Sequence, residues 1–180
     1  MSRRAAFLDR DGTIVQGVEY LSSPEELALT PNAAEAIKQF NKRGYLTVIV
    51  TNQSGIARGY FTEERLTEIH HRLIEMLSRE GARIDAIYYC PHLAEGIIEA
   101  YSIDCQCRKP RPGMLLRAAR EHDINLSASI MIGDTPADVM AGKAVGCKTV
   151  LVQPHNNGFD MPENPDLIVK DLMGAVSLVS

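Results

Sequence analysis

The sequence predicts an α/β fold: a three-layer, Rossmann-like parallel sheet with helices on both faces. Short apolar, β-branched runs alternate with helical patterns along the 180 residues. This order is typical of parallel sheets in which the chain returns through a helix after each strand. Polar residues capable of chemistry stand directly after several of the runs. They fall at the carboxyl ends of the predicted strands, where such sheets bind ligands.

Each predicted element rests on a local pattern. The predicted strands lie at residues 5–9, 45–51, 84–89, 130–133, 148–152 and 167–169. The predicted helices lie at residues 31–43, 62–81, 114–122 and 137–145. Gly44 and Gly146 are typical residues just past a helix end, whereas Thr62 and Asp171 are typical caps at a helix start. Because no linker or repeat interrupts this order, we expect a single domain over residues 1–180.

The composition is that of an ordinary soluble protein, with 45% hydrophobic and 23% charged residues. No stretch approaches the roughly 18 uninterrupted apolar residues of a membrane helix. Asp9 and Asp11 interrupt the first apolar run too early for a signal peptide. The net charge of −4 gives no general attraction to nucleic acid or to an anionic membrane. We therefore expect a cytoplasmic monomer that binds neither nucleic acid nor membrane, with local cations or a metal to attract any anionic substrate.

The segment Asp9-Arg10-Asp11-Gly12-Thr13 directly follows the first predicted strand. A carboxylate at Asp9 can attack phosphorus, while Asp11 can protonate the leaving oxygen and later activate water against the acyl phosphate. Gly12 allows the chain to turn sharply beside a bound phosphate. Taken alone, the segment is more simply explained as a turn whose aspartates bond backbone amides.

Three further residues favour the chemical interpretation. Thr51 ends a predicted strand and offers a hydroxyl to a transferring phosphoryl oxygen, and Lys109 offers a cation that neutralises phosphoryl charge. Asp134 ends another predicted strand. Together with Asp9 and the backbone carbonyl of Asp11, it forms a hard oxygen site suited to Mg²⁺.

A second metal site is indicated by Cys90, His92, Cys105 and Cys107. The twelve residues between the two pairs allow the chain to return and close one tetrahedral Zn²⁺ site. Four protein ligands leave no position open for water, so we expect this zinc to be structural and to pin a small loop, residues 90–107. The alternatives are two buried cysteines beside an unrelated histidine, or a Cys105–Cys107 disulfide.

Taken in order, the segments around these residues resemble the four motifs of the haloacid dehalogenase-like phosphatases, from Phe7 to about Val152. The resemblance implies the fold of that family and hydrolysis through a phosphoaspartyl intermediate. It implies a catalytic set made up of Asp9, Asp11, Thr51 and Lys109. It further implies that Mg²⁺ is held by Asp9, Asp11 and Asp134.

Longer segments are similar to one subfamily, that of the heptose-bisphosphate phosphatases and histidinol-phosphatases. They are Phe-Leu-Asp-Arg-Asp-Gly-Thr (7–13), Val-Thr-Asn-Gln-Ser-Gly-Ile-Ala-Arg-Gly (50–59), Tyr-Tyr-Cys-Pro-His (88–92) and Cys-Gln-Cys-Arg-Lys-Pro-Arg-Pro-Gly-Met (105–114). The resemblance implies removal of the C7 phosphate of D-glycero-D-manno-heptose 1,7-bisphosphate, in the synthesis of nucleotide-activated heptose for lipopolysaccharide. Hydrolysis of histidinol phosphate in histidine biosynthesis, or of another small phosphate ester, is the alternative. The substrate contacts that it implies are Arg10, Gly17, Val18, Glu19, Tyr20, Asn52, Gln53, Ser54, Arg108 and Thr135.

Two of the polar positions leave alternatives open. Thr135 is a short neutral residue where the heptose enzymes often carry lysine, so the contact with the second phosphate stays undetermined. Asp138 has two explanations, support of the magnesium or bonding at a helix end. The intervals between the motifs are too short for a large cap domain, so we expect loops to roof the site.

Two other classes of function stay open on the sequence. A phosphoryl-transferring mutase would share the same aspartates, but it must exclude water from the phosphoaspartate, and the absence of a large cap argues against it. A non-catalytic binding module stabilised by zinc would not need both Asp9 and Asp11.

Overall fold

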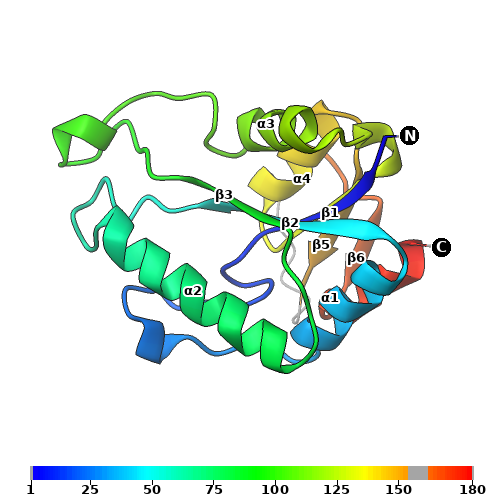
Figure 1. The fold of residues 1–180 in the computed structure, drawn as a ribbon. Coiled ribbons are helices and arrows are strands. Elements are labelled where there is room, and N and C mark those ends of the chain that lie inside the picture. The colour runs from blue at the N-terminus through cyan, green and yellow to red at the C-terminus, as the bar shows by residue number, and fades with distance from the viewer. Residues whose placement is uncertain (1, 154–161, 180) are drawn as a thin grey trace.

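The computed structural model describes residues 2–153 and 162–179. Six strands form one parallel sheet in the order β3-β2-β1-β4-β5-β6 (Figure 1). The strands are β1 (Arg4–Leu8), β2 (Tyr45–Asn52), β3 (Ala86–Cys90), β4 (Ile130–Gly133), β5 (Lys148–Val152) and β6 (Leu167–Val169). The predicted parallel α/β fold is therefore confirmed.

Helices cover both faces of the sheet and form the three expected layers (Figure 1). On one face, Ala6 and Leu8 of β1 share a core with α1 (Ala33–Lys42), α2 (Glu63–Arg79) and α5 (Leu172–Ala175). On the other face, Ala5 and Phe7 share a core with α3 (Gly113–His122) and α4 (Pro136–Ala144). Successive strand residues point to opposite faces, so a single buried strand contributes to both cores.

The ends of several elements follow from local chemistry. Thr62 accepts a hydrogen bond from a backbone amide in the first turn of α2, and Asp171 does the same for α5, as the sequence predicts. The first helix begins at Ala33 and not at residue 31, because Asn32 adopts a left-handed conformation with φ of 61°. The third strand begins two residues later than predicted and extends to Cys90, which places a thiol at its carboxyl end.

The strand order brings the two strands that carry the predicted aspartates together. β1 lies between β2 and β4. After β1 the chain forms β2 and β3 on one side of it and then crosses to the other side to form β4, β5 and β6. The Asp9 amide donates to the carbonyl of Ile132 at 2.9 Å, so the pairing continues to the end of β1. Asp9 and Asp134 thus leave neighbouring strands at the switch point of the sheet, where ligands bind in open α/β folds.

No inserted domain covers this edge in residues 2–153 and 162–179. The segment between β1 and α1 contains one 3₁₀ turn at Pro24–Glu26 and two isolated β-bridges at Val15. The segment between β3 and α3 contains another at Glu99–Tyr101 and projects from the molecule (Figure 1). In the same ranges, none of the helices combines the length and the apolar character needed to cross a membrane.

Candidate active site

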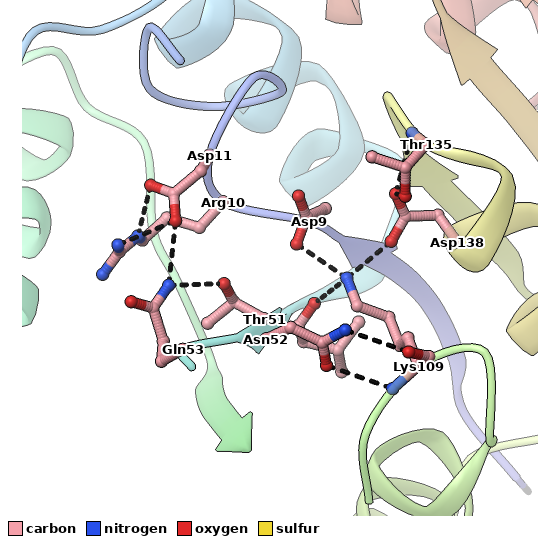
Figure 2. A network of polar contacts seen from close by, with 10 residues as sticks. Asp9, Arg10, Asp11, Thr51, Asn52, Gln53, Lys109, Thr135 and Asp138 are labelled. Atoms are coloured by element: carbon pink, nitrogen blue, oxygen red, sulfur yellow. Dashed lines mark hydrogen bonds and ion pairs between the residues drawn. The ribbon is translucent and has the colours of Figure 1, made fainter. Parts of the chain in front are cut away.

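A buried lysine lies at the centre of the candidate site. The Lys109 ammonium donates to Asp9 Oδ1 at 2.7 Å, to Asp138 Oδ1 at 2.5 Å and to the Val50 carbonyl at 2.7 Å (Figure 2). These three acceptors match the three protons of an ammonium group. Burial acts to lower the pKa of Lys109, but the charges of Asp138 and Asp9 raise it above its ordinary value. The side chain is therefore a fixed cation.

Negative charge exceeds positive charge around this lysine. Asp9, Asp134 and Asp138 each place a carboxylate oxygen within 4.8 Å of the other two, and Lys109 pairs with only two of them. Burial raises the pKa of Asp9 to about 8, against the charge of Lys109. Burial, followed by the charge of Asp138, raises the pKa of Asp134 to about 6. A divalent cation would stabilise both carboxylates in the charged form.

Asp134 supplies a second indication that the site fits a cation. Its Oδ1 is buried and has no hydrogen-bond partner among the residues described. A buried carboxylate oxygen without a partner is energetically costly. An oxygen-preferring metal bound by Asp9 and Asp134, with the Asp11 carbonyl as the predicted third ligand, would remove that cost. The donor set therefore fits Mg²⁺.

Two glycines allow the carboxylates to approach so closely. Gly12 has φ of 81°, and a Cβ on it would overlap the Asp134 carboxylate. A Cβ on Gly133 would overlap the Asp138 carboxylate in the same way. Any larger residue at either position would push an acidic side chain out of place. The Asp-x-Asp-Gly and Gly-Asp segments of the sequence thus form one packed unit.

Asp138 bonds at the start of α4. Its Oδ2 accepts hydrogen bonds from the Thr135 amide at 3.0 Å and the Thr135 hydroxyl at 2.7 Å, while Oδ1 binds Lys109 (Figure 2). With both oxygens occupied, Asp138 holds Lys109 in position. Of the two explanations that the sequence left open, the geometry favours helix-end bonding over direct metal support. Thr135, predicted to contact substrate, donates its hydroxyl proton to this carboxylate.

Asp11 points away from Asp9 and toward a second cation (Figure 2). Arg10 donates to Asp11 from Nε and Nη2, both at 2.9 Å, and Gln53 Nε2 donates to it at 2.9 Å. The Asp11 side chain is still 31% exposed. It can therefore exchange these partners for a substrate oxygen by rotating, which a general acid needs.

The geometry adds internal contacts to three residues predicted to bind substrate. Arg10 is fully buried, so its guanidinium faces Asp11 and not the solvent. Both amide atoms of Asn52 bond the Lys109 backbone at 3.0 Å. Gln53 joins Asp11 to the Thr51 hydroxyl, which accepts from Nε2 at 2.9 Å. These contacts position side chains that are predicted to be catalytic, and contact of the three residues with substrate stays a prediction.

The loop predicted to line the pocket begins beside Gly12. Gly17 lies close to Gly12, since a Cβ on Gly17 would be 3.7 Å from the Gly12 Cα. Gly17, Val18 and Glu19 are exposed. Tyr20 packs edge-on against Tyr60 with ring centroids 4.7 Å apart, which anchors the far end of the loop. Among the described residues, no hydrogen bond or ion pair joins this loop to Thr51 or Lys109, and its role in substrate binding stays a prediction.

The predicted ligands of the second metal converge. The thiol of Cys107 lies 3.1 Å from those of Cys90 and Cys105, and His92 Nδ1 lies 3.3 Å from Cys107. All three thiols are free, so the Cys105–Cys107 disulfide is not formed. The four atoms lie within 4.8 Å of one another, as a tetrahedral site requires. Arg108 follows directly, and its Nη1 donates to the His92 carbonyl at 3.4 Å.

Comparison with known proteins agrees with this geometry. A family model described as HAD-hydrolase-like matches residues 106–175. A D-glycero-beta-D-manno-heptose-1,7-bisphosphate 7-phosphatase of Rhodopseudomonas palustris is 45% identical over 144 residues, 80% of each chain. The enzyme of the same name from Pasteurella multocida is 45% identical over 152 residues, covering 84% of this chain and 82% of the relative. The chain is a haloacid dehalogenase-like hydrolase. It belongs to the family of the heptose-1,7-bisphosphate 7-phosphatases.

A solved structure supports the same assignment. The crystal structure of D,D-heptose 1,7-bisphosphate phosphatase from B. bronchiseptica, complexed with magnesium and phosphate, has a TM-score of 0.84 and 34% identity. The alignment covers 97% of both chains. The fold and family that the four sequence motifs indicate are thus confirmed.

One buried residue of the site region was missed in the sequence. His70 of α2 is 7% exposed, and its Nε2 lies 3.2 Å from Arg10 Nη1. Burial lowers the pKa of His70 to about 3, and the charge of Arg10 adds to the shift. Helical periodicity places His70 on the buried face with Leu66 and Leu73. A histidine at such a position is the one sign of a buried polar contact that the sequence offered.

The lowered pKa of His70 predicts a dependence of stability on pH. Between about pH 6.5 and pH 3 the unfolded chain binds a proton at His70 and the folded chain does not, so the free energy of unfolding falls as pH falls. His70→Gln should remove this contribution, which is at most about 1.4 kcal/mol per pH unit. Urea unfolding of both proteins at pH 7.0 and 5.0 measures it. If the free energy of unfolding falls equally in the wild type and in His70→Gln between pH 7.0 and 5.0, His70 is not a neutral, buried residue.

Proposed function

We propose that this protein is a Mg²⁺-dependent phosphatase that removes the C7 phosphate of D-glycero-D-manno-heptose 1,7-bisphosphate. The observation that carries the proposal is the state of Asp9. Lys109 holds its Oδ1, and no described residue donates a hydrogen bond to Oδ2. Oδ2 is therefore available to attack phosphorus at the switch point of the sheet.

The reaction is divided between the two aspartates. Asp9 Oδ2 attacks phosphorus and forms an acyl phosphate, while Asp11 gives a proton to the leaving sugar oxygen. Asp11 then takes a proton from the water that attacks this acyl phosphate, which releases phosphate and frees Asp9. Lys109 and the Thr51 hydroxyl stabilise the charge on the phosphoryl oxygens. Asp9, Asp134 and the Asp11 carbonyl would hold Mg²⁺, which would supply positive charge to the phosphoryl oxygens.

The choice of substrate rests on the family. The relatives described above carry the heptose-bisphosphate name, which favours this substrate over histidinol phosphate. The names of the relatives include both the beta and the alpha anomer. Thr135 is neutral and offers no cation to a second phosphate, and its hydroxyl already donates to Asp138. Arg108 is then the cation that we propose for substrate recognition. A cytoplasmic location and a monomeric state stay predictions from the sequence.

The substrate assignment predicts a preference that phosphate release can measure. With Mg²⁺, kcat/KM for heptose 1,7-bisphosphate should exceed that for histidinol phosphate, and removal of Mg²⁺ with EDTA should abolish both activities. Since EDTA also removes zinc, restoring Mg²⁺ and Zn²⁺ separately identifies the metal that turnover needs. A preference of about a hundredfold for histidinol phosphate, or about 2.7 kcal/mol, would overturn the heptose assignment. Phosphate release equal to substrate loss separates hydrolysis from phosphoryl transfer to another acceptor.

The mechanism predicts that Asp9→Asn abolishes turnover without unfolding the chain. An amide cannot form the acyl phosphate, so kcat should fall by about 10⁴-fold or more. Asp123→Asn is a matched control, because Asp123 is exposed, its left-handed conformation also suits asparagine, and its carbonyl accepts from the Arg3 amide at the opposite end of the sheet. Circular dichroism of both variants checks the fold. Activity of Asp9→Asn near that of the wild type would refute the nucleophile.

We further propose that Cys90, His92, Cys105 and Cys107 bind a structural Zn²⁺. A backbone contact joins this loop to the start of α3, where the Gly113 amide donates to the Gln106 carbonyl at 3.0 Å. A Cβ on Gly113 would overlap that carbonyl, so the contact is close. Since Lys109 follows within two residues of Cys107, the zinc would fix the segment that delivers the catalytic cation.

The zinc proposal predicts different results for two thiol deletions. Cys105→Ala should lose bound zinc and lower the melting temperature, because three ligands hold the metal less tightly. Cys147→Ala is the matched control. It removes a thiol that is more deeply buried than that of Cys105, with its pKa raised to about 12 by burial, but that lies outside the four predicted ligands. Elemental analysis and thermal unfolding measure both effects. An unchanged zinc content in Cys105→Ala would disprove the ligand assignment.

A further inference from the structure

The contact between His70 and Arg10 has a defined direction. An arginine can only donate, so His70 Nε2 must accept the hydrogen bond from Nη1. The ring is neutral, because burial lowers the pKa of His70 to about 3. Nδ1 therefore carries the proton of the imidazole.

The rest of the Arg10 guanidinium is committed to Asp11. Nε donates to Asp11 Oδ1 and Nη2 to Asp11 Oδ2, both at 2.9 Å. Because Arg10 is fully buried, water cannot replace a lost partner at Nη1. His70 thus binds Nη1 of the guanidinium, while Nε and Nη2 bind Asp11.

We propose that His70 is a positioning residue for the general acid–base Asp11, acting through Arg10. This inference rests on the proposed phosphatase function. A neutral acceptor suits the position, since a carboxylate in place of His70 would compete with Asp11 for the guanidinium. An apolar residue would leave Nη1 unpaired, and the guanidinium could then shift and carry Asp11 with it. Asp11 must rotate toward the leaving oxygen from a fixed starting point, and the anchored Arg10 provides that point.

The leaving group distinguishes positioning from a purely structural role. Departure of a sugar alkoxide needs a proton from Asp11, whereas p-nitrophenolate leaves readily without one. Because kcat/KM covers only the steps up to loss of the leaving group, it isolates protonation from the later hydrolysis of the acyl phosphate. Damage to the fold or to Asp9 would lower kcat/KM for both substrates alike.

The decisive variant is His70→Leu, assayed on heptose 1,7-bisphosphate and on p-nitrophenyl phosphate. We expect kcat/KM to fall about tenfold or more on the sugar phosphate and less than about threefold on the aryl phosphate. Asp11→Asn should show the same selectivity with a larger loss, of about 10²–10⁴-fold on the sugar phosphate. His70→Gln should restore most of the activity, because its amide oxygen can accept from Arg10. His71→Leu, at the exposed neighbouring position, should behave as the wild type.

The outcomes separate this inference from the function on which it rests. If folded His70→Leu loses kcat/KM equally on both substrates, or on neither, the role of His70 is overturned. Normal turnover by the wild type upholds the phosphatase function in that case. A wild type inactive on the sugar phosphate would overturn the function itself. If His70→Leu does not fold, ¹⁵N NMR of the wild type tests the geometry directly. A neutral ring with an unprotonated, hydrogen-bonded Nε2 at pH 5 supports the inference, and a protonated Nε2 overturns it.

Discussion

The ammonium group of Lys109 lies between Asp9 and Asp138, and the arrangement of the site depends on it. A charge buried this completely is stable only if its protons are all bonded and its field is balanced by opposite charges. Asp9, Asp138 and the Val50 carbonyl meet the first condition. The same contacts join β1, β2, the start of α4 and the loop before α3. One side chain thereby ties together four segments far apart in the sequence.

The contacts of Lys109 bring an excess of negative charge with them. The carboxylates of Asp9, Asp134 and Asp138 meet because Gly12 and Gly133 have no side chains to keep them apart. One lysine cannot neutralise three carboxylates. The balance of charge and the unpartnered Asp134 oxygen both favour a divalent metal, and a dianionic phosphate then has two cations to meet.

The two aspartates of the first motif have opposite environments although one residue separates them. Asp9 is buried beside Lys109, which binds Oδ1 and leaves Oδ2 as the proposed attacking atom. Asp11 is partly exposed and held by Arg10 and Gln53. Buried Arg10, which is held by His70, fixes the resting position of the Asp11 carboxylate. Different surroundings thus suit one carboxylate to attack and the other to move protons.

The sequence alone determined the parallel α/β fold, the residue types of the site and the family. These are local matters, because strand and helix patterns depend on neighbouring residues. Thr51 lies at the end of a strand, Asp9 and Asp134 follow strands, and Lys109 precedes a helix. The sequence also predicted that the three cysteines and His92 converge, because only twelve residues separate the two pairs of ligands. The predicted strands and helices differ from the observed ones at their ends, as at Asn32, whose left-handed conformation delays the start of α1.

Only the tertiary structure decided how the supporting residues divide their contacts. Asn52 bonds the Lys109 backbone, and Gln53 bonds Asp11. Arg10 is buried against Asp11, and Asp138 binds Lys109 as well as the start of α4. His70 gave no chemical signal, since its position on a helix face is that of any core residue. Its partner is sixty residues away in the sequence. Hydrogen-bond direction, burial and the balance of charge depend on distances across the fold, and the order of residues in the chain does not contain them.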